Sequence, residues 1–173
     1  MRLLTIGATA LCVLYAATAQ AQLTRVDLQL VARVLGFLEK PLTGTVRLGI
    51  VYVPSDDQSV HEADSDLALL GSGLQAGNLL FTPVRVRIDQ AAAAQVDVFF
   101  LPEGLADQAT QISDVAKRRK IPCVTLDIAQ VRNGICAIGV QIVPKIEIYV
   151  NRAAAEDDDT TFGSVFRMMI TEF

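Results

Sequence analysis

Short apolar strands alternate with helical segments along this chain, and this order constrains its fold more than any other feature. Val46–Val53 and Val96–Leu101 are apolar runs closed by proline, and Ile121–Leu126 is a third run; such runs are typical of buried strands. Asp27–Glu39 and Leu105–Lys120 have the composition and spacing of helices. Because strands separated by helices usually pair in parallel and carry the helices on the sheet faces, the order predicts an α/β domain.

The segments between these elements are less regular. Ser55–Asp66 is polar and acidic, which favours a loop, and Leu67–Leu74 has the leucine spacing of a helix weakened by glycine. Val84–Ile88 alternates apolar residues with arginine, the pattern of a half-exposed strand at a sheet edge. Ala91–Ala94 favours a short helix or turn.

The last third of the chain changes character. Ile135–Ile142 and Ile146–Val150 alternate apolar and polar positions around a proline turn, so we expect an antiparallel hairpin. Asn151 is expected to cap a short alanine-bearing helix. Glu156–Asp159 is expected to form a solvated loop, and Phe166–Ile170 is expected to form a closing strand. The expected fold is a single three-layer α/β domain with a mixed sheet, parallel strands first and the hairpin near the C-terminus.

The first twenty-one residues indicate the compartment. Arg2 precedes the apolar run Leu3–Ala17, and Ala19-Gln20-Ala21 offers small residues at a cleavage site, as in a secretory signal peptide. The run is shorter than the about 20 apolar residues that span a bilayer, so no direct membrane insertion is expected. We therefore expect cleavage after Ala21, a signal peptide at 1–21, and one periplasmic domain at 22–173.

Composition argues against one class of partner. The chain carries 19 acidic and 15 basic residues, for a net charge of −4. An acidic domain is a poor binder of nucleic acid, because phosphate neutralisation needs clustered cations. No nucleic-acid partner is expected.

The cysteines have three possible roles. Cys12 falls within the signal segment, which leaves Cys123 and Cys136 as an even pair in an oxidising compartment. One disulfide between them is the leading interpretation, with free thiols and a metal site as alternatives. A metal site needs further ligands, and His61, the one histidine, has no spacing relation to either cysteine.

No catalytic or cofactor motif is evident. The serines lack the Gly-x-Ser-x-Gly elbow of α/β hydrolases, and the glycines around Ser72 lack a phosphate-binding pattern. The acidic group around His61, formed by Glu62, Asp64 and Asp66, does not match a calcium loop and is interpreted as a hydrated loop. We expect no catalysis, no cofactor and no metal.

Two regions resemble a known family. Asn133-Gly134-Ile135, the strand Lys145–Asn151 and the helix start Ala153–Ala155 are similar to the C-terminal part of YfiR-like periplasmic proteins. The segment Leu30–Leu38 is similar to the opening helix of that family. The resemblance implies a secreted regulator that contacts the periplasmic part of an inner-membrane diguanylate cyclase and controls cyclic-di-GMP signalling, with a possible homodimer.

Apolar residues near the two ends of the domain are the candidates for this partner contact. They are Leu35, Phe37, Leu38, Phe166 and Met169. In the mechanism we expect, these residues form an apolar patch whose exposure changes with conformation and so shifts the partner between two states. The alternative, which the large apolar side chains favour, is that these residues lie in the core.

Two further functions remain open at this point. A secreted α/β domain also resembles one lobe of a periplasmic solute-binding protein, in which the loops Pro54–Asp56 and Pro102–Gly104 would line the site at the carboxyl ends of the strands. The other alternative is a structural subunit of an envelope complex.

Overall fold

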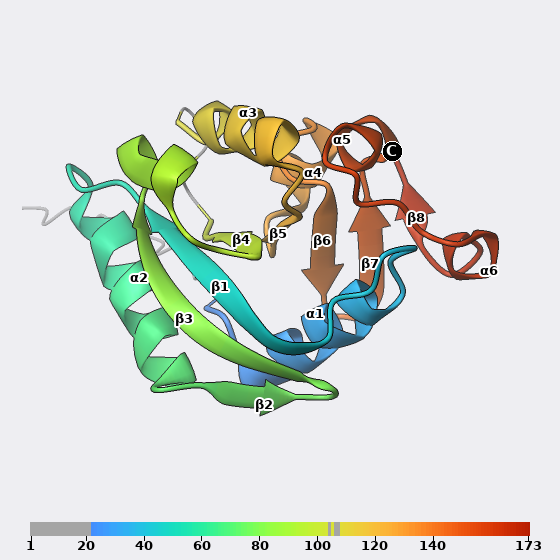
Figure 1. Cartoon of the computed structure of the whole chain (residues 1–173), viewed down its shortest axis with the longest axis horizontal. Coiled ribbons are helices and arrows are strands. Elements are labelled where there is room, and N and C mark those ends of the chain that lie inside the picture. Colours follow the sequence, from blue (N-terminus) through green and yellow to red (C-terminus); the bar gives the residue numbers. More distant parts are fainter. Residues whose placement is uncertain (1–21, 104, 106–107) are drawn as a thin grey trace, which may run out of the picture.

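A mixed β-sheet runs through the domain (Figure 1). The computed structural model describes residues 22–103, 105 and 108–173, and within these residues eight strands form one sheet in the order β2-β3-β1-β4-β5-β6-β7-β8. The strands are β1 (Gly44–Tyr52), β2 (Leu74–Ala76), β3 (Leu79–Arg87), β4 (Val98–Leu101), β5 (Cys123–Thr125), β6 (Ile138–Gln141), β7 (Glu147–Val150) and β8 (Thr171–Glu172). The helices are α1 (Arg25–Gly36), α2 (Asp57–Leu70), the 3-10 helix η1 (Ile88–Ala93), α3 (Thr110–Arg119), α4 (Ile128–Arg132), α5 (Arg152–Asp157) and α6 (Ser164–Arg167). The predicted signal segment lies outside the described residues.

Strand pairing confirms the predicted α/β fold. The strands β3, β1, β4, β5 and β6 run parallel to one another, whereas β2 is antiparallel to β3 and β7 is antiparallel to β6. The hairpin pairs Ile138 with Val150 and Gln141 with Glu147, as its alternating sequence indicates. At the far edge β2 pairs only with the start of β3, which leaves Val84–Arg87 on the outer side of the sheet. The predicted edge strand is therefore found.

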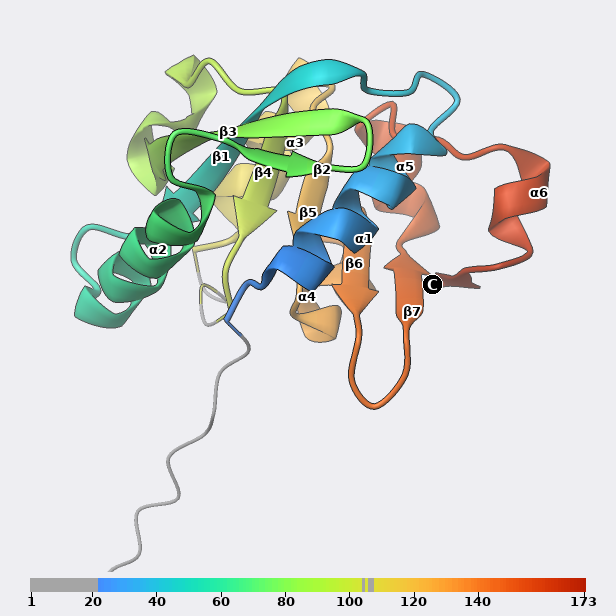
Figure 2. The ribbon, with the colours of Figure 1, turned by 90° about the horizontal axis from the view of Figure 1, so that it is seen from below.

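Helices cover both faces of the sheet (Figures 1 and 2). One face packs under α1 and α2 and buries Leu48 and Ile50 of β1, and the other packs under η1 and α3 and buries Val51. Successive strand residues point to opposite faces, so β1 contributes to both cores. This double burial explains why β4 and residues 48–51 of β1 are continuously apolar in sequence.

The chain enters α1 through a capping box. The Thr24 hydroxyl accepts a hydrogen bond from the Asp27 N–H at 3.2 Å, and the Asp27 carboxylate accepts from the Thr24 N–H at 2.8 Å. Leu28 and Leu35 are then fully buried against the sheet. The expected amphipathic helix is confirmed, although it ends at Gly36 rather than Glu39.

The predicted loop Ser55–Asp66 is wrong, because the helix α2 already begins at Asp57. Asp56 caps it and accepts hydrogen bonds from the N–H groups of Gln58 and Ser59. Its buried positions, Ser59, Ala63, Asp66 and Leu70, follow the helical period. Three of them, Ser59, Ala63 and Asp66, are small or polar, so a pattern based on large apolar residues missed them.

The helix expected to continue to Leu74 also ends early. Gly71 and Gly73 adopt positive φ angles, which favour glycine, and they turn the chain into β2. The following strand β3 begins at Leu79, five residues before the predicted edge strand. The predicted helix Leu105–Lys120 begins at Thr110, and Lys120 ends it in the left-handed conformation.

Two C-terminal expectations need correction, and a third is confirmed. The predicted closing strand Phe166–Ile170 contains the end of α6 and a turn, and the last strand, β8, is confined to two residues after it. The predicted solvated loop Glu156–Asp159 lies at the end of α5, and its residue Asp158 is buried. Asn151 does cap α5, because its Oδ1 accepts from the Ala154 N–H at 3.0 Å.

The structure joins Cys123 and Cys136 in a disulfide. Cys123 begins β5 and Cys136 precedes β6, with 4.8 Å between their Cα atoms. Both side chains are fully buried in the core under α3. The bond therefore ties two adjacent parallel strands on one face of the sheet.

Candidate functional site

The strand order reverses at β1 and β4. From β1 the chain passes through α2 to β3 on one side, and it returns to β4 on the other side of β1. In open α/β sheets, ligands bind in the crevice at the carboxyl ends of the strands where the order reverses. This edge of the sheet is therefore the first place to look for a site.

A small cavity lies at this edge, and we name it the carboxyl-edge cavity. It has a volume of about 20 Å³ and is lined by Gln22, Leu23, Glu62, Asp66, Phe100, Pro102, Glu103 and Leu126. A cavity of this size holds one group about as large as a water molecule. A larger groove of about 220 Å³ adjoins it and is lined by Gln22, Thr24, Asp27, Leu126 and Val140–Val143. Gln22 and Leu126 line both.

Asp66 is the most buried acidic group of the cavity. It is 5% exposed and projects from α2. Burial raises the pKa of its carboxyl to about 7, the charge of Glu62 raises that pKa further, and a backbone hydrogen bond from Leu23 opposes the rise. An added positive charge would stabilise the ionised form of Asp66.

Glu62 lies one helical turn before Asp66. Burial raises the pKa of Glu62, the negative charges of Glu103 and Asp56 raise it further, and His61 opposes them. The side-chain amide of Gln58 donates a hydrogen bond to the Glu62 carboxylate at 3.1 Å. The carboxyl groups of α2 and of the segment after β4 are thus close enough to repel one another.

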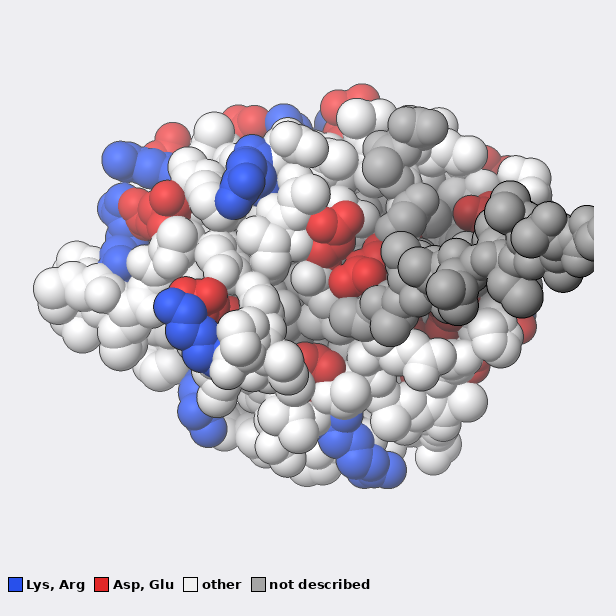
Figure 3. Space-filling view, turned by 180° about the vertical axis from the view of Figure 1, so that it is seen from behind, with Lys and Arg blue, Asp and Glu red and all other residues white. Residues whose placement is uncertain are grey.

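The charged side chains that line this cavity are acidic. Its described lining residues include three carboxyl groups, from Glu62, Asp66 and Glu103, and neither lysine nor arginine. On the face seen in Figure 3, several acidic side chains lie near the middle of the molecule. A cationic group that enters the cavity would relieve both desolvation and mutual repulsion, so the arrangement favours an ammonium ligand.

The structure brings one of the two predicted binding loops to this cavity. Pro102 and Glu103 line it, whereas Gly104 lies outside the described residues. In the other loop, Asp56 is engaged as the cap of α2 and reaches the site only through its charge on Glu62.

Sequence reasoning missed the role of Glu62 and Asp66, which it assigned to a hydrated loop. Their spacing of four residues, the distance of one helical turn, is the signal that would have placed them on one helix face. The contribution of Gln22 and Leu23 has no such signal, because these residues reach the cavity only through tertiary folding.

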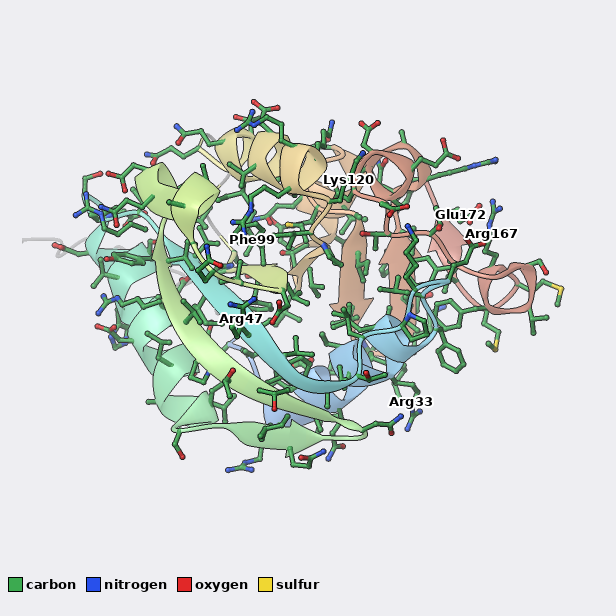
Figure 4. All side chains as sticks on the ribbon, viewed as in Figure 1. Arg33, Arg47, Phe99, Lys120, Arg167 and Glu172 are labelled. Atoms are coloured by element: carbon green, nitrogen blue, oxygen red, sulfur yellow. A yellow bond between two sulfur atoms is a disulfide. The ribbon has the colours of Figure 1, made fainter. Side chains whose placement is uncertain are left out.

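A second surface feature surrounds α6 at one end of the molecule (Figure 4). Phe37, Val165, Met168 and Met169 are exposed apolar side chains, from 45% for Phe37 to 79% for Met168. We name these four residues the α6 patch. The Phe37 ring stacks on Phe166, with 4.5 Å between ring centroids. Residues from the two ends of the domain thus meet there.

The predicted partner contacts divide between this patch and the core. Leu35, Leu38 and Phe166 are buried and pack in the core under α1 and α2, so they offer no contact surface in this conformation. Phe37 and Met169 are exposed. The partner-binding role of these two residues stays a prediction.

Ion pairing holds α6 in place next to the last strand. The Arg167 guanidinium and the Glu172 carboxylate point toward one another in Figure 4 and form two hydrogen bonds, at 2.6 and 2.9 Å. Both side chains are largely solvent-accessible, so this pair positions α6 more than it stabilises the fold.

Residues 22–103, 105 and 108–173 contain no group of three or more His, Cys, Asp or Glu side chains placed to hold a metal ion. No helix among them is long and apolar enough to cross a membrane.

Comparison with known proteins supports the fold. No protein-family model matches this chain, and no curated protein matches it. A solved structure of the ABC domain in complex with L-Trp from Streptococcus pneumonia is similar over 83% of this chain, with a TM-score of 0.57 and 14% identity. The chain shares its α/β fold. A conserved domain protein from Vibrio cholerae is similar over 86% of this chain, with a TM-score of 0.56 and 12% identity. The matched region covers 59% of each of these two structures.

Proposed function

We propose that this protein is a non-catalytic binding protein of the cell envelope that takes a small amine-bearing solute at the carboxyl edge of its sheet. The observation that carries the proposal is the convergence of Glu62, Asp66 and Glu103 on one cavity at the point of strand reversal. The ammonium group of the solute enters the carboxyl-edge cavity, and the rest of the solute lies in the adjoining groove. Orientation by a few polar groups beside apolar walls is the usual composition of such sites.

Two other observations support this proposal. A structural neighbour is described in complex with L-Trp, a solute that carries an ammonium group. The disulfide between Cys123 and Cys136 is of the kind that persists in oxidising compartments. The signal segment expected at residues 1–21 agrees with that location.

Calorimetric titration tests the proposal with a matched pair of ligands. L-Tryptophan carries the amine, and indole-3-propionate has the same ring and carboxylate without it. We expect binding of the first and none of the second. Equal binding of both would contradict the role of the carboxyl groups.

Variants on one helix identify the site. Glu62→Gln removes a cavity charge and is expected to weaken binding of L-tryptophan about tenfold, the effect of about 1.4 kcal/mol. Asp64→Asn is the control, because Asp64 lies on the same helix but pairs with Arg85 at 2.9 Å. Equal losses in both variants would indicate an effect on the helix rather than on the site.

A second function, the partner contact of a YfiR-like regulator, is favoured by the α6 patch. Exposed methionines adapt to different partner surfaces, and an apolar patch on a folded domain often marks a protein contact. The partner proposed for this surface is the periplasmic part of an inner-membrane diguanylate cyclase, as the family resemblance implies.

Crosslinking in intact envelopes, followed by mass spectrometry, tests the regulator function. We expect capture of a membrane protein with a periplasmic segment and a cytoplasmic cyclase, and loss of that capture in Met168→Ser/Met169→Ser. Val143→Ser is the control, because Val143 is equally exposed but lies in the distant β6–β7 turn. Recovery of self-crosslinks alone would support a homodimer and refute the cyclase contact.

A further inference from the structure

We propose that cleavage after Ala21 gives Gln22 an α-ammonium group that occupies the carboxyl-edge cavity and competes there with the amine of a solute. The competition rests on the proposed function, whereas the placement of the amino terminus rests on the fold and on cleavage after Ala21. Removal of the signal peptide would then place a cation in the carboxyl-edge cavity.

The placement follows from how the start of the domain is held. Gln22 lines the cavity together with Glu62 and Asp66. The next residue, Leu23, is anchored twice: its side chain is buried in the core, and its backbone hydrogen-bonds the Asp66 carboxyl. Thr24 is then fixed as the cap of α1. The Gln22 nitrogen lies only one residue, about 3.8 Å of chain, before the hydrogen-bonded residue.

Processing changes the chemistry of that nitrogen. In a chain that continues before Gln22 it is a neutral peptide nitrogen, whereas at a new terminus it is an amine with an ordinary pKa of about 7.7–8.0 and is mostly protonated at neutral pH. The ammonium ion would face the carboxyl groups of Glu62, Asp66 and Glu103. The other charged groups that act on this cluster are Asp56 and His61, at the start of α2.

The expected consequences are reciprocal. The ammonium ion stabilises the ionised form of Asp66 and so lowers its pKa, and the carboxylates stabilise the ammonium ion and so raise the pKa of the amine. A solute amine must displace this internal cation from the mature protein. An unprocessed chain has no such competitor.

The test compares two proteins: the mature chain beginning at Gln22, and the same chain with Ala19-Gln20-Ala21 retained. Mass spectrometry first establishes where the envelope protein begins and that the Gln22 amine is free. NMR titration then follows the Asp66 carboxyl in both proteins and the α-amine in the mature protein. We expect the pKa of Asp66 to be lower in the mature protein by about one unit or more, and the pKa of the α-amine to lie above about 8.

Variants of the mature protein test whether the α-amine lies beside the carboxyl groups of the cavity or beside other acidic residues of α2. Asp66→Asn is expected to lower the pKa of the α-amine, and the control Asp64→Asn to leave it unchanged, because Asp64 is exposed and paired with Arg85. A mature chain that begins at another residue, or the same pKa of Asp66 in both proteins, would overturn the placement.

Binding distinguishes failure of this inference from failure of the proposed function. The NMR titration needs no solute. If neither protein bound L-tryptophan, the proposed function would be refuted, but the NMR titration would still test where the amino terminus lies. If L-tryptophan binds, we expect the extended protein to bind it about tenfold more tightly. Equal affinity in the two proteins would overturn the competition.

Discussion

The buried carboxyl of Asp158 makes the stability of this fold depend on pH. Asp158 follows α5, is 2% exposed, and leaves its Oδ1 without a hydrogen-bond partner among the described residues. Burial raises its pKa to about 7; Lys117 and Lys120 oppose the rise, and Asp157 adds to it. The perturbation we propose is Asp158→Asn, which keeps the shape of the side chain and removes its charge.

The magnitude follows from the difference between the folded and unfolded pKa values. Between about pH 4 and pH 7 the folded state binds more protons than the unfolded state, so stability falls as pH rises through this range and levels off above it. The shift of Asp158 from 3.8 to about 7 corresponds to a loss of about 4 kcal/mol over the whole range. Between pH 5 and pH 8 the same relation gives about 2.5 kcal/mol.

Urea denaturation of the wild type and of Asp158→Asn at pH 5 and pH 8 measures this effect. We expect the free energy of unfolding of the variant, relative to that of the wild type, to be about 2.5 kcal/mol higher at pH 8 than at pH 5. Asp64→Asn is the control, because Asp64 is exposed, is ion-paired with Arg85 at 2.9 Å and is not among the charges that shift the pKa of Asp158, so its difference from the wild type should stay constant. A constant difference for Asp158→Asn as well would refute the argument that burial of Asp158 causes the pH dependence.

Three further predictions concern stability. Removal of the disulfide in Cys123→Ala/Cys136→Ala should cost about 3 kcal/mol and lower Tm by about 6–12 °C, which calorimetry measures; an unchanged Tm would mean that the bond constrains nothing. Gly139→Ala should cost about 1–3 kcal/mol, because a Cβ there would lie 2.6 Å from Val131, and Val131→Ala in the same chain should recover part of the loss in urea denaturation. Asn151→Ala should cost about 1 kcal/mol through loss of the α5 cap, and a Tm equal to that of the wild type would show that the cap is dispensable.

Local signals explain the parts of the fold that the sequence predicts. The strand β4 and residues 48–51 of β1 are continuous apolar runs, and the β6–β7 hairpin alternates apolar and polar positions around its turn. A continuous apolar run indicates a strand buried on both faces, and an alternating pattern indicates a strand buried on one face. The disulfide was predicted from compartment and cysteine number, which need no knowledge of the fold.

The errors arise where burial involves small or polar residues. The inner face of α2 carries Ser59, Ala63 and Asp66, so its composition resembles a loop even though its spacing is helical. In and after α6 the apolar residues Phe166, Met168 and Ile170 alternate like strand residues, but Met168 is exposed and so is the neighbouring Met169. Hydrophobic pattern and burial disagree at both places, and both belong to the proposed binding surfaces.

The candidate site is only partly visible in the sequence. The loop after β4, with Pro102 and Glu103, was predicted from the rule that ligands bind at strand ends. Glu62 and Asp66 join it from α2, and Gln22 joins it from the start of the domain. These residues are far apart along the chain, and it is the crossing of α2 over the sheet that brings them together.

Chemical-shift mapping during titration with L-tryptophan tests most directly whether a solute binds at the carboxyl-edge cavity. We expect the backbone amide shifts to concentrate around this cavity and to weaken in Glu62→Gln; the residues concerned are Leu23, Glu62, Asp66, Glu103 and Leu126. Shifts confined to the α6 patch, or no shifts at a ligand concentration that saturates ordinary solute-binding proteins, would contradict it.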